Sequence, residues 1–258
     1  MDIQRYIYNN FTASIMKKYF ILLLFTLIYP SFSVMAQSLP KIYKPKIIAF
    51  TFDACMTNGM LKKLETGTEK ALFNSGILTY LHQEKIPATI FITGLWAEKY
   101  PEAVKEIGSD PLFEIGNHSY SHRAFTADCY SLPTIADKDK QDDILKTQEI
   151  IGRLTGKKPG LFRFPGGCNS PMDQNLVKKL GLKVVGWTFP SGDAFNSNTV
   201  AIVENVLRQA KSGAIVVFHL DGGRYAPKTL DAIRSIIPAL KKQGYEFVKV
   251  SKIQSRSY

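Results

Sequence analysis

Short, almost uninterrupted apolar segments alternate with amphipathic segments along the chain from residue 46 onward. Apolar segments of this kind are typical of strands that are covered on both faces in a parallel sheet. Because parallel strands need crossover connections, the alternation predicts an α/β fold with a mainly parallel sheet, either open or rolled into a barrel. The predicted strands are Lys46–Phe52, Ala88–Thr93, Leu112–Gly116, Leu161–Arg163, Lys183–Trp187, Ala214–His219 and Glu246–Val250.

The amphipathic segments predict helices, and two of them are the clearest, Asp142–Leu154 and Leu230–Lys242. In the second, the apolar residues recur at a spacing that places them on one helical stripe. Pro238 is expected to bend this helix, and Gly244 is expected to end it, since glycine readily adopts the left-handed conformation of a C-cap. Residues 124–140 are polar and contain a proline, and they are predicted to form a long loop.

Polar side chains follow the predicted strands at the points where the strands end. The carboxyl ends of parallel strands meet at one edge of a sheet, where ligands and catalytic groups collect. We therefore expect these side chains to converge and to supply the metal ligands, base, base-orienting group and acid that hydrolysis of an acyl bond requires. They are Asp53 after the first strand, His118 and His122 after the third, Arg163 at the end of the fourth, Asp193 just past the fifth and His219 at the end of the sixth.

The spacing of His118 and His122 brings two imidazoles to one side of a helical turn or a tight loop. Two such rings bind one divalent ion, and the alternative is a pair of histidines that are satisfied at the surface or in the core. The polar residues at the neighbouring strand ends favour the metal site. For Arg163 and Asp193, the alternative to a catalytic role is an ion pair at the rim of the barrel.

Five short motifs contain these residues. They are Thr51-Phe52-Asp53, Asn117-His118-Ser119-Tyr120-Ser121-His122, Arg163-Phe164-Pro165-Gly166-Gly167, Ser191-Gly192-Asp193 and Val217-Phe218-His219. Each motif alone is a weak signal, but five in this order are specific, and the similarity spans about residues 46–252. With these motifs the chain resembles the polysaccharide deacetylases, the NodB-homology group or carbohydrate esterase family 4.

The resemblance implies a distorted (β/α) barrel of about seven parallel strands with a metal in a surface groove. It implies a metal-dependent hydrolase of carbon–nitrogen bonds that removes N-acetyl groups from an extracytoplasmic polysaccharide: peptidoglycan, a chitin-like chain or an exopolysaccharide. The implied metal ligands are His118 and His122 together with Asp53. The metal is expected to be zinc, with cobalt or nickel as alternatives.

The resemblance also implies roles for the residues around the metal. Asp53 would take the proton of the attacking water, and Arg163 would pair with this carboxylate and keep it ionised. His219 would protonate the departing sugar nitrogen. Asp193 would hold the ring of His219 in its tautomer and orientation.

The first motif departs from the family pattern at a metal-binding position. The family usually has a second aspartate after the first, whereas this chain has Ala54, so the usual third protein ligand is missing. One alternative is a two-histidine site completed by Asp53 or by water. Another is that Cys55 supplies a thiolate, which is a good zinc ligand. The third is a protein that binds glycans without catalysis.

Two further departures concern the substrate groove. Gly166 stands where the family often has a tyrosine, but the expected contribution there is a backbone N–H to the oxyanion. We therefore still predict that Gly166 and Gly167 contact the substrate. Ala194 replaces a usual tryptophan, which reshapes the groove. Four aromatic residues near the motifs either stack on sugar rings or belong to the core. They are Tyr120, Phe125, Trp187 and Phe189.

The N-terminal segment predicts export. Lys17 and Lys18 give a basic start, residues 19–29 form an apolar run, and Ala36 is small enough for cleavage before Gln37. Residues 1–36 are therefore predicted to be a signal peptide, with Met16 as an alternative start, and residues 37–258 to be a periplasmic or secreted catalytic domain. An apolar run of this length is too short for a membrane anchor, which needs roughly 20 residues.

The composition, with 258 residues of which 45% are hydrophobic, fits one large core. Without residues 1–36 the formal net charge falls from +11 to +9. A basic exported protein meets anionic glycans, wall polymers or lipid surfaces, and we see no nucleic-acid-binding motif. The alternative is that the lysines only solvate helix faces.

Three cysteines, Cys55, Cys129 and Cys168, allow one disulfide and one free thiol in an oxidising compartment. The sequence permits three pairings, and we favour Cys129 with Cys168. An O-acetyl esterase that acts on glycans such as xylan is the close alternative to an N-deacetylase, because the same residues serve both reactions.

Overall fold

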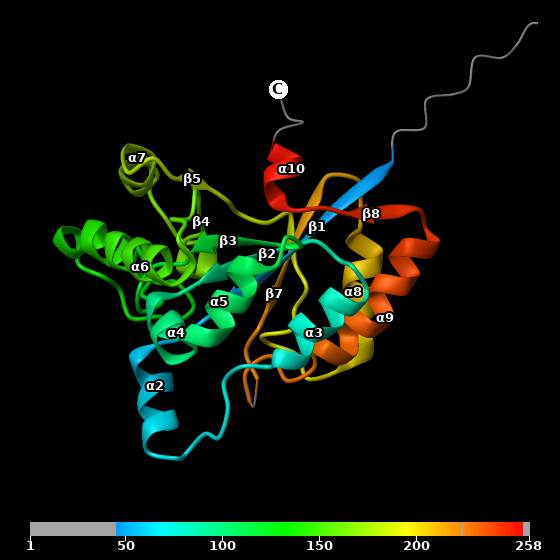
Figure 1. Cartoon of the computed structure of the whole chain (residues 1–258), viewed down its shortest axis with the longest axis horizontal. Coiled ribbons are helices and arrows are strands. Elements are labelled where there is room, and N and C mark those ends of the chain that lie inside the picture. Colours follow the sequence, from blue (N-terminus) through cyan, green and yellow to red (C-terminus); the bar gives the residue numbers. More distant parts are fainter. Residues whose placement is uncertain (1–44, 223, 255–258) are drawn as a thin grey trace, which may run out of the picture. The chain divides into compact units, whose positions relative to one another are not determined.

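The structure is a computed structural model that describes residues 45–222 and 224–254. The predicted signal peptide and its cleavage site lie outside these residues. The described ranges form a parallel sheet with helices on its two sides (Figure 1).

The sheet contains eight described strands, and every pair within it is parallel. Seven follow the order β5-β4-β3-β2-β1-β7-β6, and β8 pairs with the start of β1. The seven strands curl into a half-barrel, which confirms the predicted distorted (β/α) barrel of about seven parallel strands. The strands are β1 (Lys46–Ala54), β2 (Ala88–Ile92), β3 (Phe113–Asn117), β4 (Leu161–Phe162), β5 (Lys183–Val184), β6 (Phe189–Pro190), β7 (Ala214–His219) and β8 (Tyr245–Phe247).

Helices cover the outside of the half-barrel. Figure 1 shows α8 and α9 together on one side, with α4, α5 and α6 on the other. The helices are α2 (Asn58–Glu65), α3 (Ser75–Gln83), α4 (Gly94–Lys99), α5 (Pro101–Ser109), α6 (Lys140–Thr155), α7 (Pro171–Lys179), α8 (Thr199–Gln209), α9 (Thr229–Lys242) and α10 (Val250–Gln254), with short 3-10 turns at Asp137–Asp139 and Pro165–Gly167.

Strand β1 determines which side chains face the inside of the half-barrel. Side chains alternate along a strand, so Ile47, Ala49, Thr51 and Asp53 share one face. Ile47 and Ala49 pack with residues of α10 in one buried cluster, whereas the intervening residues of β1 pack in the main core beneath the helices. The inner row is therefore apolar at the start of β1 and polar at its carboxyl end, where Asp53 lies.

The clearest helix predictions are confirmed, since α6 contains Asp142–Leu154 and α9 contains Leu230–Lys242. Gly244 follows the C-cap of α9 with a φ of 81°, as expected for a glycine that ends a helix. Helix α9 continues through Pro238, and the expected bend stays a prediction. The predicted loop 124–140 ends in a 3-10 turn and the first residue of α6.

The predicted strand Glu246–Val250 is wrong at its end, because β8 stops at Phe247 and Val250 begins α10. The amide of Val250 donates to Oγ1 of Thr89 at 3.0 Å, and the Val250 side chain is buried in the inner cluster. This contact with β2 is distant in sequence, so strand periodicity alone does not reveal it.

The predicted strand Lys183–Trp187 is also too long, since β5 ends at Val184. The carbonyls of Val185 and Gly186 accept hydrogen bonds from the guanidinium of Arg163, at 3.3 and 3.0 Å. A buried side chain thus replaces strand pairing there, and the chain turns to form β6, which the sequence analysis did not predict.

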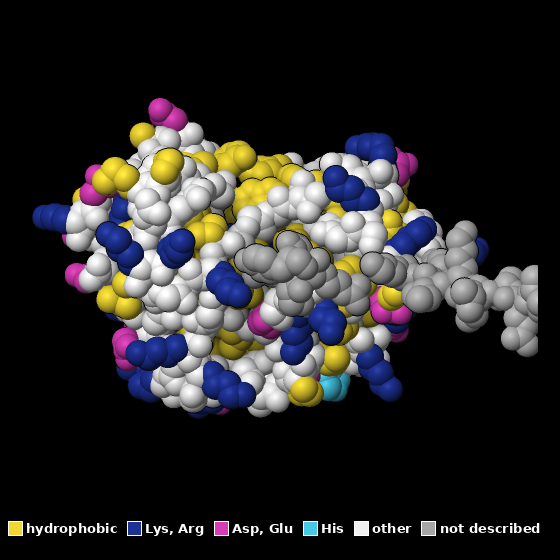
Figure 2. Space-filling model, turned by 90° about the horizontal axis from the view of Figure 1, so that it is seen from above, with side chains coloured by type: hydrophobic (Ala, Val, Ile, Leu, Met, Phe, Trp, Pro, Cys, Tyr) yellow, Lys and Arg dark blue, Asp and Glu magenta, His cyan; other side chains and the backbone are white. Residues whose placement is uncertain are grey.

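Basic side chains are spread around the face shown in Figure 2, with apolar side chains between them. On this face the charge is not gathered into one patch, which agrees with lysines that solvate the surface. Of the helices in the described ranges, none is long and apolar enough to cross a membrane.

Candidate active site

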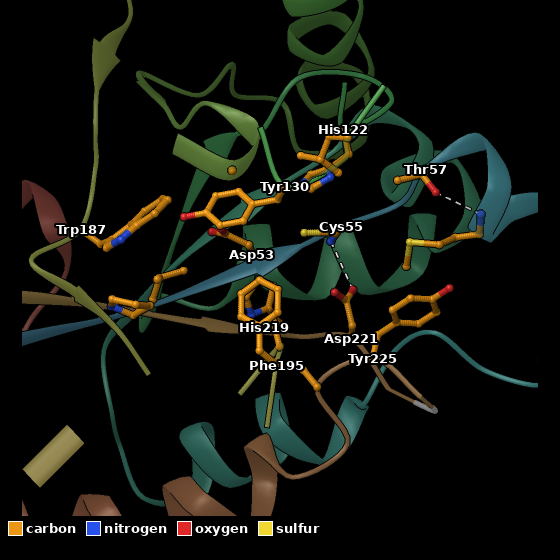
Figure 3. A pocket seen from close by; sticks show the side chains of 17 residues that line it. Asp53, Cys55, Thr57, His122, Tyr130, Trp187, Phe195, His219, Asp221 and Tyr225 are labelled. Atoms are coloured by element: carbon orange, nitrogen blue, oxygen red, sulfur yellow. Dashed lines mark hydrogen bonds between the residues drawn. The ribbon is translucent and has the colours of Figure 1, made fainter. Parts of the chain in front are cut away.

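The predicted site residues converge at the carboxyl ends of the strands. Asp53, His122 and His219 line one pocket of about 360 Å³, and Figure 3 shows their side chains directed toward its centre. His118, Arg163 and Asp193 are buried directly behind them, with at most 1% of their surface exposed. The six residues come from the ends of five different strands, β1, β3, β4, β6 and β7.

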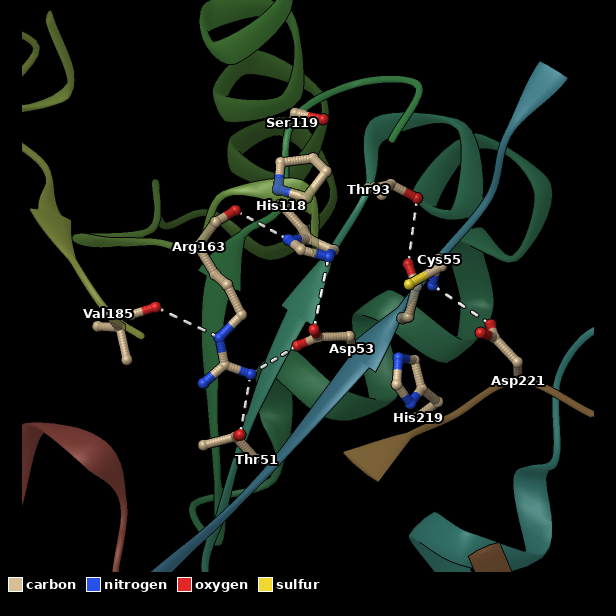
Figure 4. Close-up of polar contacts among 12 residues, drawn as sticks. Thr51, Asp53, Cys55, Thr93, His118, Ser119, Arg163, Val185, His219 and Asp221 are labelled. Atoms are coloured by element: carbon tan, nitrogen blue, oxygen red, sulfur yellow. Dashed lines mark hydrogen bonds and ion pairs between the residues drawn. The ribbon is translucent and has the colours of Figure 1, made fainter. Parts of the chain in front are cut away.

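Asp53 is held by the guanidinium of Arg163. Nη1 of Arg163 donates to Oδ1 of Asp53 at 2.7 Å and to Oγ1 of Thr51 at 2.9 Å (Figure 4). The guanidinium carbon lies 4.0 Å from the ring centroid of Phe91. Burial by itself would raise the pKa of Asp53, but the charges of Arg163, His118 and His219 and the hydrogen bond from Arg163 together outweigh it and leave the pKa below its usual value. Asp53 is therefore an ionised carboxylate that can accept a proton.

His118 presents one ring nitrogen to the site. Its Nδ1 lies 2.8 Å from the carbonyl oxygen of Arg163, which can only accept, so Nδ1 carries the proton. Its Nε2 is buried and makes no hydrogen bond to the described part of the chain, at 3.5 Å from Oδ2 of Asp53. Burial lowers the pKa of His118. The lone pair on Nε2 is thus available to a metal. The carbonyl of Arg163 fixes the ring through Nδ1, as is usual for histidines that bind metals.

The loop from His118 to His122 is held in an unusual conformation. Ser119 and His122 have φ values of 65° and 56°, in the left-handed region that side chains other than glycine rarely adopt. Asn117 accepts from the amide of Ser119 at 2.8 Å, and Asp143 of α6 accepts from the amide of Tyr120 at 2.6 Å. Left-handed residues supported in this way are characteristic of functional sites.

The loop places the two imidazoles side by side. The ring centroids of His118 and His122 are 4.9 Å apart. Burial, followed by the proximity of His118, lowers the pKa of His122 to about 3, so its ring is neutral. Neutral imidazoles are the form that binds metals.

Cys55 completes a group of three metal-binding side chains. One ligand atom each of Cys55, His118 and His122 lies within 4.8 Å of the other two. Cys55 is buried and is not part of a disulfide. Two neutral imidazoles and a thiol are a donor set that suits zinc, so these residues fit the metal that the sequence predicts. Asp53 lies beside this group, and its own role as a ligand stays a prediction.

His219 faces the pocket opposite the two histidines and is held by Asp193. Its Nδ1 lies 2.8 Å from Oδ1 of Asp193, and its backbone amide donates to Oδ2 at the same distance. Thr229, at the start of α9, also donates to Oδ2. Burial would lower the pKa of His219, but the charge and hydrogen bond of Asp193, with smaller contributions from Asp53 and Asp221, outweigh burial and raise the pKa to about 9. His219 is therefore protonated at neutral pH and suited to act as an acid.

Asp221 is a pocket residue that the sequence analysis missed. Its Oδ1 accepts from the backbone amide of Cys55 at 3.3 Å, and only 4% of its surface is exposed. Burial raises its pKa to about 8, with the charge of His219 acting in the opposite direction. Its position two residues beyond His219 is the signal that could have revealed it, because alternate residues share one face.

A disulfide between Cys129 and Cys168 fixes one wall of the pocket, which confirms the favoured pairing. Gly166 has a φ of 64°, and a Cβ there would lie 2.5 Å from Sγ of Cys129. It would also lie 3.2 Å from the ring of Tyr130, which lines the pocket. Tyr130 thus occupies the space next to Gly166. Gly166 lines the pocket, and its contact with the substrate stays a prediction. Gly167 packs closely against Trp187.

Of the aromatic side chains that line the pocket, only some were among the candidates from the sequence. Trp187 lines it as one of the predicted alternatives, whereas Phe125 and Phe189 are buried in the core. Tyr130 and Phe195 are largely exposed, with ring centroids 6.0 Å apart. These two rings lie on loops distant in sequence, so the motifs alone did not indicate them.

The sequence and the fold are similar to those of known proteins. The profile of the polysaccharide deacetylase family matches residues 41–185. A peptidoglycan-N-acetylglucosamine deacetylase of Bacillus cereus is 34% identical over 210 residues, which are 81% of this chain and 88% of that protein. The solved structure of the Bc1960 peptidoglycan N-acetylglucosamine deacetylase has a TM-score of 0.67 at 29% identity, covering 82% of this chain and 89% of that one.

A second similar structure is that of a Bacillus anthracis protein described as a CE4 family pseudoenzyme. Its TM-score is 0.65 at 23% identity, and the match covers 81% of this chain and 66% of that one. It shares the fold, which therefore does not by itself establish catalysis. The profile match and the identity to the Bacillus cereus deacetylase show that the chain belongs to the polysaccharide deacetylase family.

Proposed function

We propose that the chain is a metal-dependent hydrolase that removes N-acetyl groups from an extracytoplasmic polysaccharide, with peptidoglycan as the leading substrate. The observation that carries this proposal is one pocket with three kinds of group around it. His122 lies on one side of the pocket with the buried His118 next to it, the ionised Asp53 also lines the pocket, and the protonated His219 lies opposite His122. These are the groups that amide hydrolysis requires.

A divalent metal bound at His118 and His122 would polarise the acetyl carbonyl and a water molecule. Asp53 accepts the proton of this water, whose oxygen forms the new bond to the acetyl carbon. His219 donates a proton to the sugar nitrogen as the carbon–nitrogen bond breaks. The products are acetate and a free amine.

The hydrogen-bond partners of Asp53 and His219 keep these two residues in the protonation states that the reaction requires. Arg163 keeps Asp53 ionised, and Asp193 keeps His219 protonated and orients it so that Nε2 is free. A backbone N–H near Gly166 is the proposed donor to the oxyanion. We retain Gly166 and Gly167 as substrate contacts on this basis.

The choice of peptidoglycan is supported by the names of the similar proteins and by the predicted signal peptide. Two of the matching proteins are peptidoglycan N-acetylglucosamine deacetylases, whose substrate lies outside the cytoplasm. Zinc is the proposed metal, because imidazole and thiol donors suit it, with cobalt or nickel as alternatives. A periplasmic or secreted location follows from the same proposal.

The test is acetate release by the purified protein from peptidoglycan, N-acetylated chitin fragments and O-acetylated xylan, before and after metal removal. The proposal predicts release from an N-acetylated glycan that stops with a chelator and returns with zinc. Release from xylan alone would instead identify an O-acetyl esterase.

A non-catalytic glycan-binding protein is the second candidate, because Ala54 stands at a metal-binding position of the family. It predicts that the protein binds oligosaccharides but releases no acetate at any metal loading. The ionised Asp53 and the protonated His219 favour catalysis, since a protein that only binds glycans has no need for either state.

A further inference from the structure

Residues 54 and 55 lie in different surroundings. Ala54, which replaces the family's second aspartate, is buried in the main hydrophobic cluster. Cys55 follows it and lines the pocket, next to Asp53 in Figure 3. A donor that is absent at position 54 is thus available one residue further along the chain.

We propose that the thiolate of Cys55 is the third protein ligand of the metal, together with Nε2 of His118 and a ring nitrogen of His122. This inference rests on the proposed function, because it names a ligand of the metal which that function requires. It replaces the alternative in which Asp53 serves as both base and ligand. Asp53 then remains free to accept a proton.

The geometry of the three side chains supports this assignment. Their ligand atoms lie within 4.8 Å of one another, a spacing that one ion between them can bridge, since zinc binds sulfur at about 2.3 Å and nitrogen at about 2.1 Å. His118 adds an independent observation. Its buried Nε2 has no hydrogen-bond partner in the described ranges, although buried polar atoms are normally paired. A metal at this point supplies the missing partner.

The surroundings of Cys55 hold its backbone in place. Its amide donates to Asp221, and the carbonyl of Ala54 accepts from both the amide and Oγ1 of Thr93, at 3.2 and 3.1 Å (Figure 4). Both polar groups of the peptide bond that precedes Cys55 are therefore hydrogen-bonded. The thiol is also unavailable for a disulfide, because Cys129 and Cys168 are bonded to each other.

A thiol that binds a divalent metal is deprotonated by it, so Cys55 would bind as the thiolate. Three ligands from the protein would leave the metal accessible to water and substrate, as in catalytic zinc sites.

The test is the absorption spectrum of the purified protein with cobalt in place of the native metal. The inference predicts one cobalt per chain and a thiolate-to-cobalt charge-transfer band in the near ultraviolet. In Cys55→Ser the band is lost, and metal affinity falls by at least about 100-fold, since even outer partners of ligands typically contribute 10- to 100-fold. An unchanged band or affinity in C55S overturns the inference.

Two further variants are controls for the spectrum and the metal affinity of C55S. His82→Gln changes an exposed histidine that pairs with Asp110, and it should leave the band and the affinity unchanged. His118→Ala should lose metal binding.

If C55S does not fold, alkylation of the wild-type protein tests the inference instead. Metal should protect Cys55 from alkylation and a chelator should remove the protection, whereas an equal rate with one metal bound per chain overturns the inference.

The same samples separate this inference from the proposed function. A wild-type protein with the charge-transfer band but no acetate release contradicts the function and supports the ligand. Acetate release by a protein with one metal and no such band contradicts the ligand and supports the function.

Discussion

Arg163 donates to Asp53 at 2.7 Å from a position with no exposed surface, and the same guanidinium bridges the carbonyls where β5 ends. One buried side chain therefore sets both the charge of the base and the shape of the half-barrel beside it. Contacting Asp53 and the two carbonyls at once requires a planar group with several donors in a fixed arrangement. Arginine has such a group, and lysine does not.

We predict that Arg163→Lys weakens catalysis most at low pH. The pKa of Asp53 is held below its usual value by Arg163, so the base is ionised through the neutral range. Without the guanidinium the pKa rises, and the acid limb of the profile of kcat/KM against pH moves to higher pH. The measurement is this profile for both proteins, and superimposable acid limbs would show that Arg163 does not set the charge of the base.

Arg163→Met should instead affect stability. It leaves the Asp53 carboxylate buried without its partner, which typically costs 3–5 kcal/mol. Chemical denaturation of the metal-free proteins measures the difference. A change below about 1 kcal/mol would indicate that Asp53 becomes protonated or hydrated at little cost.

Asp193→Asn should move the alkaline limb of kcat to lower pH. Asp193 raises the pKa of His219 to about 9, so the acid stays protonated until the pH rises through that value. Without this charge the pKa falls toward the ordinary value of about 6.5. The stabilising effect of the pair is complete below about pH 6.5 and is lost as the pH rises through 9. Thermal unfolding from pH 6 to 10 should therefore show a slope in the wild type that D193N lacks.

His219→Gln should impair amide hydrolysis more than ester hydrolysis. An amine needs a proton to leave, whereas an alcohol leaves more readily, and a positioned acid typically contributes 10²- to 10⁴-fold. The measurement compares kcat/KM for matched N-acetyl and O-acetyl oligosaccharides. Equal losses on the two substrates would contradict the role of His219 as the acid.

Gly166→Ala should destabilise the wall of the pocket. The residue has a φ of 64°, and a Cβ would lie 2.5 Å from Sγ of Cys129, so we expect a loss of about 1–3 kcal/mol. Gly160→Ala is the matched control, because a Cβ there meets no atom within 4 Å. Equal stability of the two variants would show that the wall adapts without cost.

Much of the site could be predicted because its residues lie at the carboxyl ends of strands. Asp53, His118 and His219 end or follow parallel strands, and parallel strands bring these positions together whatever the details of the loops. The arrangement around Cys55 and Asp221 could not be predicted in this way. It depends on a hydrogen bond between two strand ends that are 166 residues apart.

The fold, like the site, has parts that the sequence predicts and parts that it does not. The helices and longer strands follow from local periodicity, whereas the ends of β5 and β8 depend on single buried contacts, of Arg163 with two carbonyls and of Val250 with Thr89. Likewise, the exposed rings of Tyr130 and Phe195 meet only because folding brings their loops together. Contacts of this kind leave no pattern in the neighbouring sequence.

The most direct measurement is a zinc titration of the chelator-treated protein, with acetate release from peptidoglycan as the readout. We expect no release without zinc, a linear rise that stops at one zinc per chain, and no rise in His122→Ala. Full release by the zinc-free protein, or a rise in H122A equal to that of the wild type, would contradict it.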